Sequence, residues 1–127
     1  MGEAHVRKRV LVVDDEPLMG ATLEVTLGSE HDVVIVASAQ AALALLERDQ
    51  AFDAMLSDLM MPHVSGMDLY REMRRRGYGL ADHVLFMTGG AYTEEAQSFL
   101  DEVGGAIIEK PFDMSELSRM VEHIARD

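Results

Sequence analysis

The stretch VLVVDDEP, Val10 to Pro17, decides the fold. Its four consecutive aliphatic residues are typical of a strand that is covered on both faces, as in a parallel sheet. Pro17 suits the first position of a helix, where the N–H that proline lacks would have no partner. The stretch therefore indicates a buried strand, then two carboxylates at Asp14 and Asp15, then the start of a helix.

The same alternation of a short apolar run and a helical segment recurs along the chain. Crossovers through helices make the strands parallel and place helices on both faces of the sheet. We therefore predict a (βα)5 doubly wound α/β domain, a three-layer sandwich with the flavodoxin-like strand order 2-1-3-4-5. The further strand candidates are 31–36, 54–57, 84–87 and 106–108. The helical segments are 38–49, 66–76, 96–103 and a last helix that Asp113 and Glu116 open. Ser38 is the expected N-cap of the first of these helices, and Gly77 closes the second.

Composition and net charge limit the classes of ligand that the chain can bind. The chain has 127 residues, 48% of them hydrophobic, and a formal net charge of −12, which fits one globular domain and disfavours nucleic acid or anionic membrane as a direct ligand. It has no cysteine, no apolar stretch long enough to span a membrane and no signal-peptide core, so we expect a cytoplasmic protein. We assign residues 1–8 to an N-terminal tail and 9–126 to the domain.

The residues that follow the strands carry the chemistry, because ligands of open parallel sheets bind outside the carboxyl ends of the strands. Asp14 and Asp15 follow the first strand, Asp58 the third, Thr88 the fourth and Lys110 the fifth. Three crowded carboxylates repel one another, and one lysine offsets only part of that charge. All-oxygen ligands favour Mg²⁺, and a carboxylate can accept a phosphoryl group, so the set predicts Mg²⁺-dependent phosphoryl transfer to an aspartate.

Four motifs in order resemble a response-regulator receiver domain of bacterial two-component signalling, the CheY-like superfamily. The resemblance covers the chain from about Arg9 to Ile124. The motifs are VLVVDDEP (10–17), MLSDLMMPHVSGMDL (55–69), MTGG (87–90) and EKPF (109–112).

The resemblance implies a role for each matching residue. Asp58 would accept a phosphoryl group from a histidine kinase or a histidine phosphotransfer protein, and the chain would be a phosphoacceptor rather than an enzyme with its own substrate. Asp14, Asp15, Asp58 and the backbone carbonyl of Met60 would hold Mg²⁺. Thr88 would be the switch hydroxyl and Lys110 its ion-pair partner, followed by a cis peptide bond to Pro111. The partners would include an output domain or target and a possible second copy of the chain.

Two positions depart from the family pattern, and they leave alternatives open. Ile107 stands where many members carry an aromatic residue that moves with the switch hydroxyl, and Met60 stands where polar residues are common. Ile107 motivates an alternative, a degenerate receiver that binds partners without being phosphorylated.

An aspartyl-phosphate phosphatase is less favoured because Asp14-Asp15-Glu16 lacks a DxD spacing. A flavodoxin-like electron carrier is also disfavoured, since Asp14 and Asp15 would repel a phosphate.

Overall fold

A computed structural model describes residues 6–89 and 93–126. Strands and helices alternate along the chain as expected, and a short 3₁₀ helix, η1, precedes the fourth strand. The strands are β1 (Arg9–Val13), β2 (Asp32–Val36), β3 (Ala54–Asp58), β4 (Val84–Thr88) and β5 (Ala106–Glu109). The helices are α1 (Pro17–Gly28), α2 (Ala39–Arg48), α3 (Gly66–Arg75), η1 (Gly79–Asp82), α4 (Glu94–Val103) and α5 (Met114–Ile124).

The five strands form one parallel sheet in the order β2-β1-β3-β4-β5, which confirms the predicted topology. β1 lies between β2 and β3, and the register pairs Val13 with Ser57. β3 in turn pairs Asp58 with Met87 of β4. The carboxyl ends of β1, β3 and β4 therefore lie side by side at one edge of the sheet.

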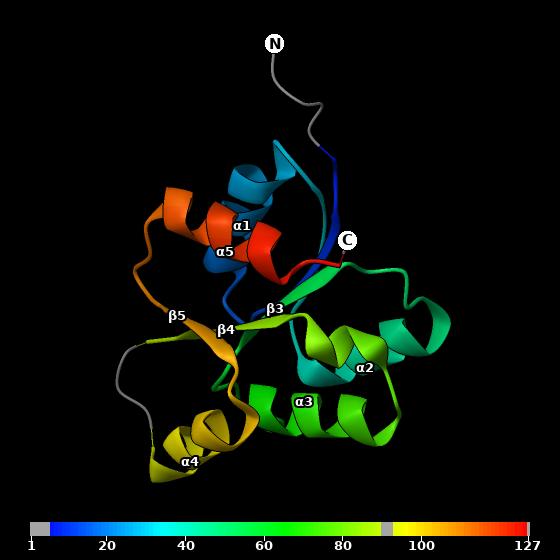
Figure 1. Cartoon of the computed structure of the whole chain (residues 1–127), viewed down its shortest axis with the longest axis vertical. Helices are drawn as coiled ribbons and strands as arrows, with labels where there is room; N and C mark the ends of the chain where they lie inside the picture. The colour runs from blue at the N-terminus through cyan, green and yellow to red at the C-terminus, as the bar shows by residue number, and fades with distance from the viewer. Residues whose placement is uncertain (1–5, 90–92, 127) are drawn as a thin grey trace.

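Helices cover both faces of the sheet (Figure 1), with α1 and α5 on one side and α2, α3 and α4 on the other. Alternate residues of one strand serve the two faces, because side chains along a strand point in opposite directions. On β1, Val10 and Val12 pack beneath α1 and α5, whereas Leu11 and Val13 pack beneath α2 and α3. The side chains of β1 thus enter an apolar cluster on each face, which explains the unbroken aliphatic run.

The helix ends follow local chemistry. Ser38 caps α2 by accepting the Ala41 N–H, and Asp113 caps α5 by accepting the N–H groups of Ser115 and Glu116, as predicted. The reciprocal capping box forms at another place, between Ser65 and Asp68 at the start of α3. Gly77, expected to end that helix, has a φ of 74°, the left-handed conformation that glycine adopts without strain.

The predicted element boundaries differ from the structure by one or two residues. Asp58 and Thr88 are the last residues of β3 and β4 rather than the residues after them, so both are held in the strand backbone. α4 begins at Glu94, where Thr93 caps it by accepting the Ala96 N–H.

Two expectations concern parts of the chain outside the sheet. Of the predicted tail, residues 1–5 lie outside the described residues, whereas Arg7 bonds the carbonyl of His31 at 2.8 Å. Within 6–89 and 93–126, no helix combines the length and apolarity that crossing a membrane requires.

Candidate functional site

Three carboxylates meet at the carboxyl ends of β1 and β3. Asp14 and Asp15 directly follow β1, and Asp58 ends β3, its hydrogen-bonded neighbour. One oxygen from each of these three carboxylates lies within 4.8 Å of the other two. We call Asp14, Asp15 and Asp58 the acidic cluster. The sequence predicted this convergence from the positions of the strand ends.

The members of the acidic cluster differ in their exposure. Asp14 is 2% exposed and Asp58 is 8% exposed, whereas Asp15 is exposed to solvent. The Asp14 carboxylate accepts the Glu16 N–H at 2.9 Å, which fixes the turn after β1. The cluster therefore combines two fixed, buried carboxylates with one at the surface.

Lys110 brings a positive charge to the buried pair. Its Nζ lies 3.2 Å from Asp14 Oδ2 and 3.4 Å from Asp58 Oδ2. Burial alone would lower the pKa of Lys110, but the charges of Asp58 and Asp14 outweigh it, so the pKa is raised and the ammonium form is held. One ammonium group thus bridges two carboxylates from different strands.

The charge on Asp58 remains incompletely compensated. Burial raises the pKa of Asp58 above its ordinary value; the charge on Lys110 opposes this increase, and that on Asp14 adds to it. The net shift is upward, so the ionised form of Asp58 is less favourable in the fold than in water. A further cation at this place would relieve that cost.

The structure places Thr88 beside this group through the backbone. Thr88 ends β4, is 2% exposed, and its carbonyl accepts the Lys110 N–H at 2.7 Å. The peptide bond between Lys110 and Pro111 is cis, as the family resemblance implied. Gly90, the last residue of the MTGG motif, lies outside the described residues.

Two contacts at Asp58 were not predicted from the sequence. The Met60 N–H donates to Asp58 Oδ1 at 3.4 Å, and the Met60 side chain is 45% exposed. Gly66 packs directly against the Asp58 backbone, because a Cβ built at Gly66 would lie 2.1 Å from the Asp58 carbonyl oxygen. The only signal for this contact in the sequence is a glycine at the start of a helix, where glycine is common for other reasons.

The donors of the acidic cluster fit a divalent metal ion. Carboxylate oxygens are the ligands that Mg²⁺ and Ca²⁺ prefer, whereas zinc favours nitrogen and sulfur. Mg²⁺ is commonly held by one or two carboxylates and retains several waters, which a partly exposed cluster allows. Burial is the main cause of the raised pKa of Asp58 and the charge on Asp14 adds to it, so a cation bound here would favour the ionised form of Asp58.

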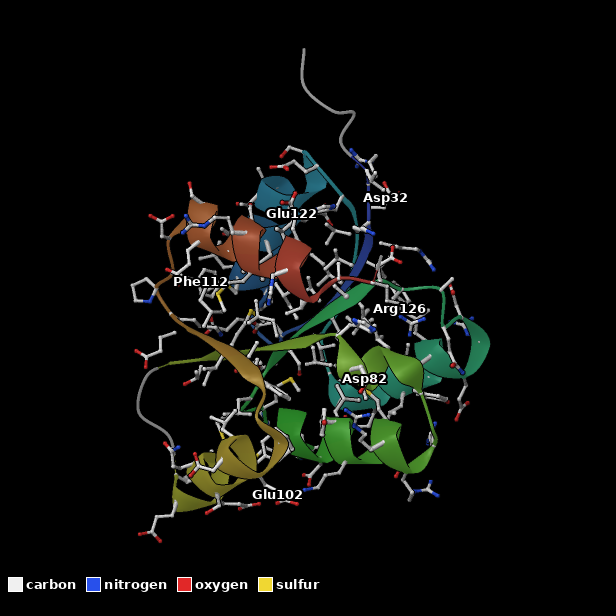
Figure 2. The ribbon with its side chains drawn as sticks, viewed as in Figure 1. Asp32, Asp82, Glu102, Phe112, Glu122 and Arg126 are labelled. Atoms are coloured by element: carbon white, nitrogen blue, oxygen red, sulfur yellow. The ribbon has the colours of Figure 1, made fainter. Side chains whose placement is uncertain are left out.

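A second group of possible ligands joins Glu30, His31 and Glu122. Figure 2 shows Glu122 on α5. No spacing rule connects these residues in the sequence. The Lys8 N–H donates to His31 Nδ1 at 3.1 Å, so in the neutral ring the proton sits on Nε2. In that form the ring nitrogen that faces away from Lys8 has no lone pair for a metal ion.

Ile107 is half-buried and packs against the core beneath α3 and α4. In the register of the sheet it lies opposite Phe86 of β4. Phe86 forms edge-to-face contacts with Tyr70 of α3 and Phe99 of α4, with ring centroids 5.8 and 5.4 Å apart. The aromatic contacts of Phe86 on this side of the sheet are therefore made with α3 and α4.

The fold and the acidic cluster define a class: a doubly wound α/β domain with a carboxylate site at the carboxyl ends of its parallel strands. The response regulator receiver domain model matches residues 10–122. The chain therefore belongs to the response regulator receiver domain family, the signalling domains of two-component systems.

Known proteins are similar over almost the whole chain. The response regulator protein PmrA of Pseudomonas aeruginosa is 32% identical over 119 residues, which are 93% of this chain and 52% of that protein. This chain thus spans about half the length of that relative.

Two solved structures are similar in fold and sequence. A response regulator receiver protein from Pseudomonas putida has a TM-score of 0.82 and 29% identity, and the match covers 94% of this chain and 99% of that one. The receiver domain of the sensor histidine kinase PA1611 from Pseudomonas aeruginosa has a TM-score of 0.80 and 28% identity. The match covers 93% of this chain and 97% of that one. That structure holds a magnesium ion in its active-site cleft.

Proposed function

We propose that this chain is a phosphoacceptor receiver that accepts a phosphoryl group on Asp58 in a Mg²⁺-dependent reaction. The observation that carries the proposal is the bridging of Asp14 and Asp58 by Lys110, with Asp15 completing the acidic cluster. The phosphodonor would be a phosphohistidine of a histidine kinase or of a histidine phosphotransfer protein.

The reaction follows from the chemistry of these groups. An Asp58 oxygen attacks phosphorus, a P–O bond forms, and the P–N bond of phosphohistidine breaks with its electron pair going to the imidazole, which takes up a proton. Lys110 neutralises charge on the phosphoryl oxygens and Thr88 donates a hydrogen bond to one of them. Asp14, Asp15, Asp58 and the Met60 carbonyl would hold Mg²⁺, which would supply further positive charge for the phosphoryl group.

The same residues account for loss of the phosphoryl group. A water molecule can attack the acyl phosphate, and Met60, two residues after Asp58, has an exposed apolar side chain. Because turnover of this kind acts on the chain itself, we assign no separate substrate. We infer that residues 9–126 form the receiver domain and that its output passes to another domain, to a target protein or to a second copy.

The degenerate receiver remains the second candidate, because Ile107 occupies the position of the family's moving aromatic residue. Against it, the acidic cluster, Thr88 and Lys110 are all present at the strand ends.

Incubation with acetyl phosphate and Mg²⁺ followed by intact-mass measurement separates the two candidates. We expect the chain to gain the mass of one phosphoryl group, and Asp58→Asn to gain none. The matched control is Asp53→Asn, which alters the aspartate that directly precedes the same strand. An unmodified wild-type chain, or an equal gain in Asp58→Asn, would contradict the proposal.

A further inference from the structure

Ser57 is a buried polar residue next to the proposed phosphoacceptor, and the proposed reaction gives it no role. In the described part of the chain, the buried polar or charged residues are Asp14, His31, Ser57, Asp58 and Thr88. Three of these belong to the proposed site, and His31 accepts the Lys8 N–H. Ser57 is fully buried. Burial of a hydroxyl group costs free energy unless the group forms a hydrogen bond, so the partner of Ser57 indicates what it does.

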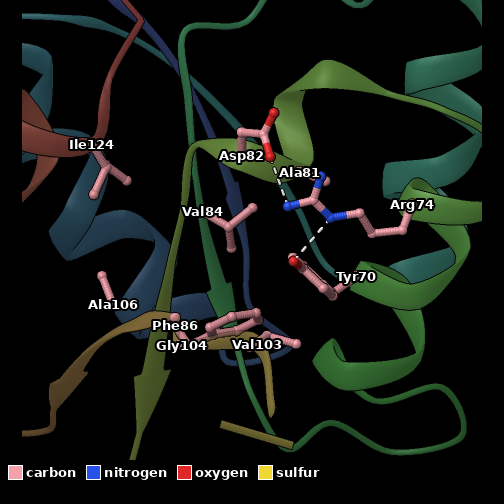
Figure 3. Close-up of a pocket in the computed structure, with 11 residues that line it drawn as sticks. Tyr70, Arg74, Ala81, Asp82, Val84, Phe86, Val103, Gly104, Ala106 and Ile124 are labelled. Carbon is pink, nitrogen blue, oxygen red and sulfur yellow. Dashed lines mark hydrogen bonds and ion pairs between the residues drawn. The ribbon is translucent and has the colours of Figure 1, made fainter. Parts of the chain in front are cut away.

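The Ser57 side chain lies on the face of the sheet that α3 covers. In the register Ser57 stands between Val13 of β1 and Phe86 of β4, and both of these pack in the apolar cluster beneath α2, α3 and α4. Figure 3 shows Phe86 beside Tyr70 of α3 on this face, and their ring centroids are 5.8 Å apart. Side chains alternate along a strand, so the Asp58 side chain points to the opposite face. Ser57 can therefore affect the acidic cluster only through the backbone.

The Ser57 hydroxyl contacts both the backbone of Asp58 and the start of α3. It donates a hydrogen bond to the Asp58 carbonyl oxygen at 3.2 Å. A Cβ built at Gly66 would lie 3.0 Å from Ser57 Oγ and 2.1 Å from that carbonyl oxygen, so only glycine leaves room for both. The Gly66 N–H in turn donates to the Leu59 carbonyl at 3.0 Å. The junction of β3 with α3 is thus fixed by a side-chain bond and a main-chain bond.

This junction carries atoms that the proposed site requires. The loop between Leu59 and Gly66 includes Met60, whose N–H donates to Asp58 Oδ1 at 3.4 Å and whose carbonyl is a proposed ligand of Mg²⁺. The Asp58 carbonyl belongs to the peptide unit that links Asp58 to this loop. A rotation of that peptide unit would therefore move the Met60 carbonyl relative to the Asp58 carboxylate.

We propose that Ser57 is a positioning residue of the phosphoacceptor site, where its hydroxyl holds the Asp58 carbonyl and thereby orients the Asp58 carboxylate and the Met60 carbonyl. This inference rests on the proposed function. Replacing a residue that holds metal ligands in place changes metal affinity or activity by about 10- to 100-fold. Ser57→Ala keeps the Cβ and removes only the hydroxyl, so it tests this one contact.

Titrations of the ¹⁵N-labelled protein with Mg²⁺, followed by the Leu59 and Met60 amide signals, test the inference without a phosphodonor. We expect the dissociation constant for Mg²⁺ to rise about tenfold in Ser57→Ala. Met55→Val is the matched control, because it removes buried apolar volume from the same face of β3, two residues before Ser57. It should bind Mg²⁺ as the wild type does. An unchanged dissociation constant in Ser57→Ala, or an equal increase in Met55→Val, would overturn the inference.

Rates of modification by acetyl phosphate separate positioning from a loss of stability. Ser57→Ala should need about tenfold more Mg²⁺ for its half-maximal rate, whereas its rate at saturating Mg²⁺ should approach that of the wild type. A variant that is harmed only in stability would instead lose rate at every Mg²⁺ concentration, and this result would contradict the inference. A wild type that is not modified would refute the proposed function and the inference with it. A modified wild type that Ser57→Ala matches at every Mg²⁺ concentration would refute the inference alone.

Discussion

The Lys110 ammonium group lies 3.4 Å from the Asp58 carboxylate, although 52 residues separate the two in the sequence. The same nitrogen lies 3.2 Å from Asp14, so a single cation holds together the ends of β1, β3 and β5. The Asp14 side chain in this contact is fully buried, and the Lys110 side chain is 18% exposed. Little water screens the interaction, so removal of the lysine would leave two buried carboxylates without a compensating charge.

Replacing Lys110 with methionine should destabilise the metal-free protein by about 2 kcal/mol, because two buried carboxylates then face each other without a cation. Chemical denaturation in the presence of a chelator measures the change. Arg119→Met, which removes an exposed cation from α5, is the control and should have little effect. Equal stability of Lys110→Met and the wild type would show that the bridge is not a stabilising contact.

Asp58→Asn should stabilise the metal-free protein at neutral pH, by an amount of order 1 kcal/mol. The pKa of Asp58 is raised in the fold, mainly by burial, so its ionised form costs stability when the pH is above that pKa. Below the unfolded pKa of about 4 the carboxyl group is neutral in both states, and the advantage of asparagine should disappear. Urea unfolding of both proteins between neutral and acidic pH, with Glu24→Gln as an exposed control, measures this difference. A destabilised Asp58→Asn at neutral pH would refute it.

Millimolar Mg²⁺ should raise the melting temperature of the wild type, because an ion that binds only the folded state stabilises it by mass action. Asp14→Asn and Asp15→Asn should each reduce the increase, since each removes a carboxylate from the acidic cluster. Differential scanning fluorimetry over a Mg²⁺ series provides the measurement. Asp101→Asn, on the exposed surface of α4, should respond like the wild type. A melting temperature that is insensitive to Mg²⁺ would contradict the proposed metal site.

Gly66→Ala should destabilise the protein by about 2 kcal/mol, because its Cβ would clash with the Asp58 carbonyl oxygen 2.1 Å away. The backbone that carries the proposed phosphoacceptor would then have to move. Gly28→Ala is the matched control, since a Cβ at Gly28 meets nothing within 4 Å. Urea unfolding of both variants measures the loss of stability. Their rates of modification by acetyl phosphate show whether the backbone at Asp58 has also moved. Tolerance of alanine at residue 66 would show that the close contact is not required.

The sequence was sufficient to predict the sheet because each strand carries its own signal. The run from Val10 to Val13 is apolar on both faces, and the structure uses both faces for separate cores. The carboxyl ends of parallel strands lie at one edge, so the convergence of Asp14, Asp15 and Asp58 followed from the order of the strands. The ends of β3 and β4 were harder to predict, because their last residues, Asp58 and Thr88, lack the apolar character of the residues before them.

Contacts that depend on packing could not be predicted. Nothing in the local pattern at Gly66 indicates that the Asp58 carbonyl lies against it, because the two residues are brought together only when α3 docks on β3. The same holds for His31 and Glu122, which come from opposite ends of the chain. A pocket lined by Arg74 and Asp82 also depends on packing, since six separate elements and one turn line it.

The most direct test of the central claim is ¹⁹F NMR of beryllofluoride, an acyl-phosphate analogue, added with Mg²⁺ to the wild type and to Asp58→Ala, Thr88→Ala and Lys110→Ala. The account predicts signals of bound beryllofluoride in the wild type, their absence in Asp58→Ala, and weaker binding in the other two variants. Bound signals that persist unchanged in Asp58→Ala would show that Asp58 is not the phosphoacceptor.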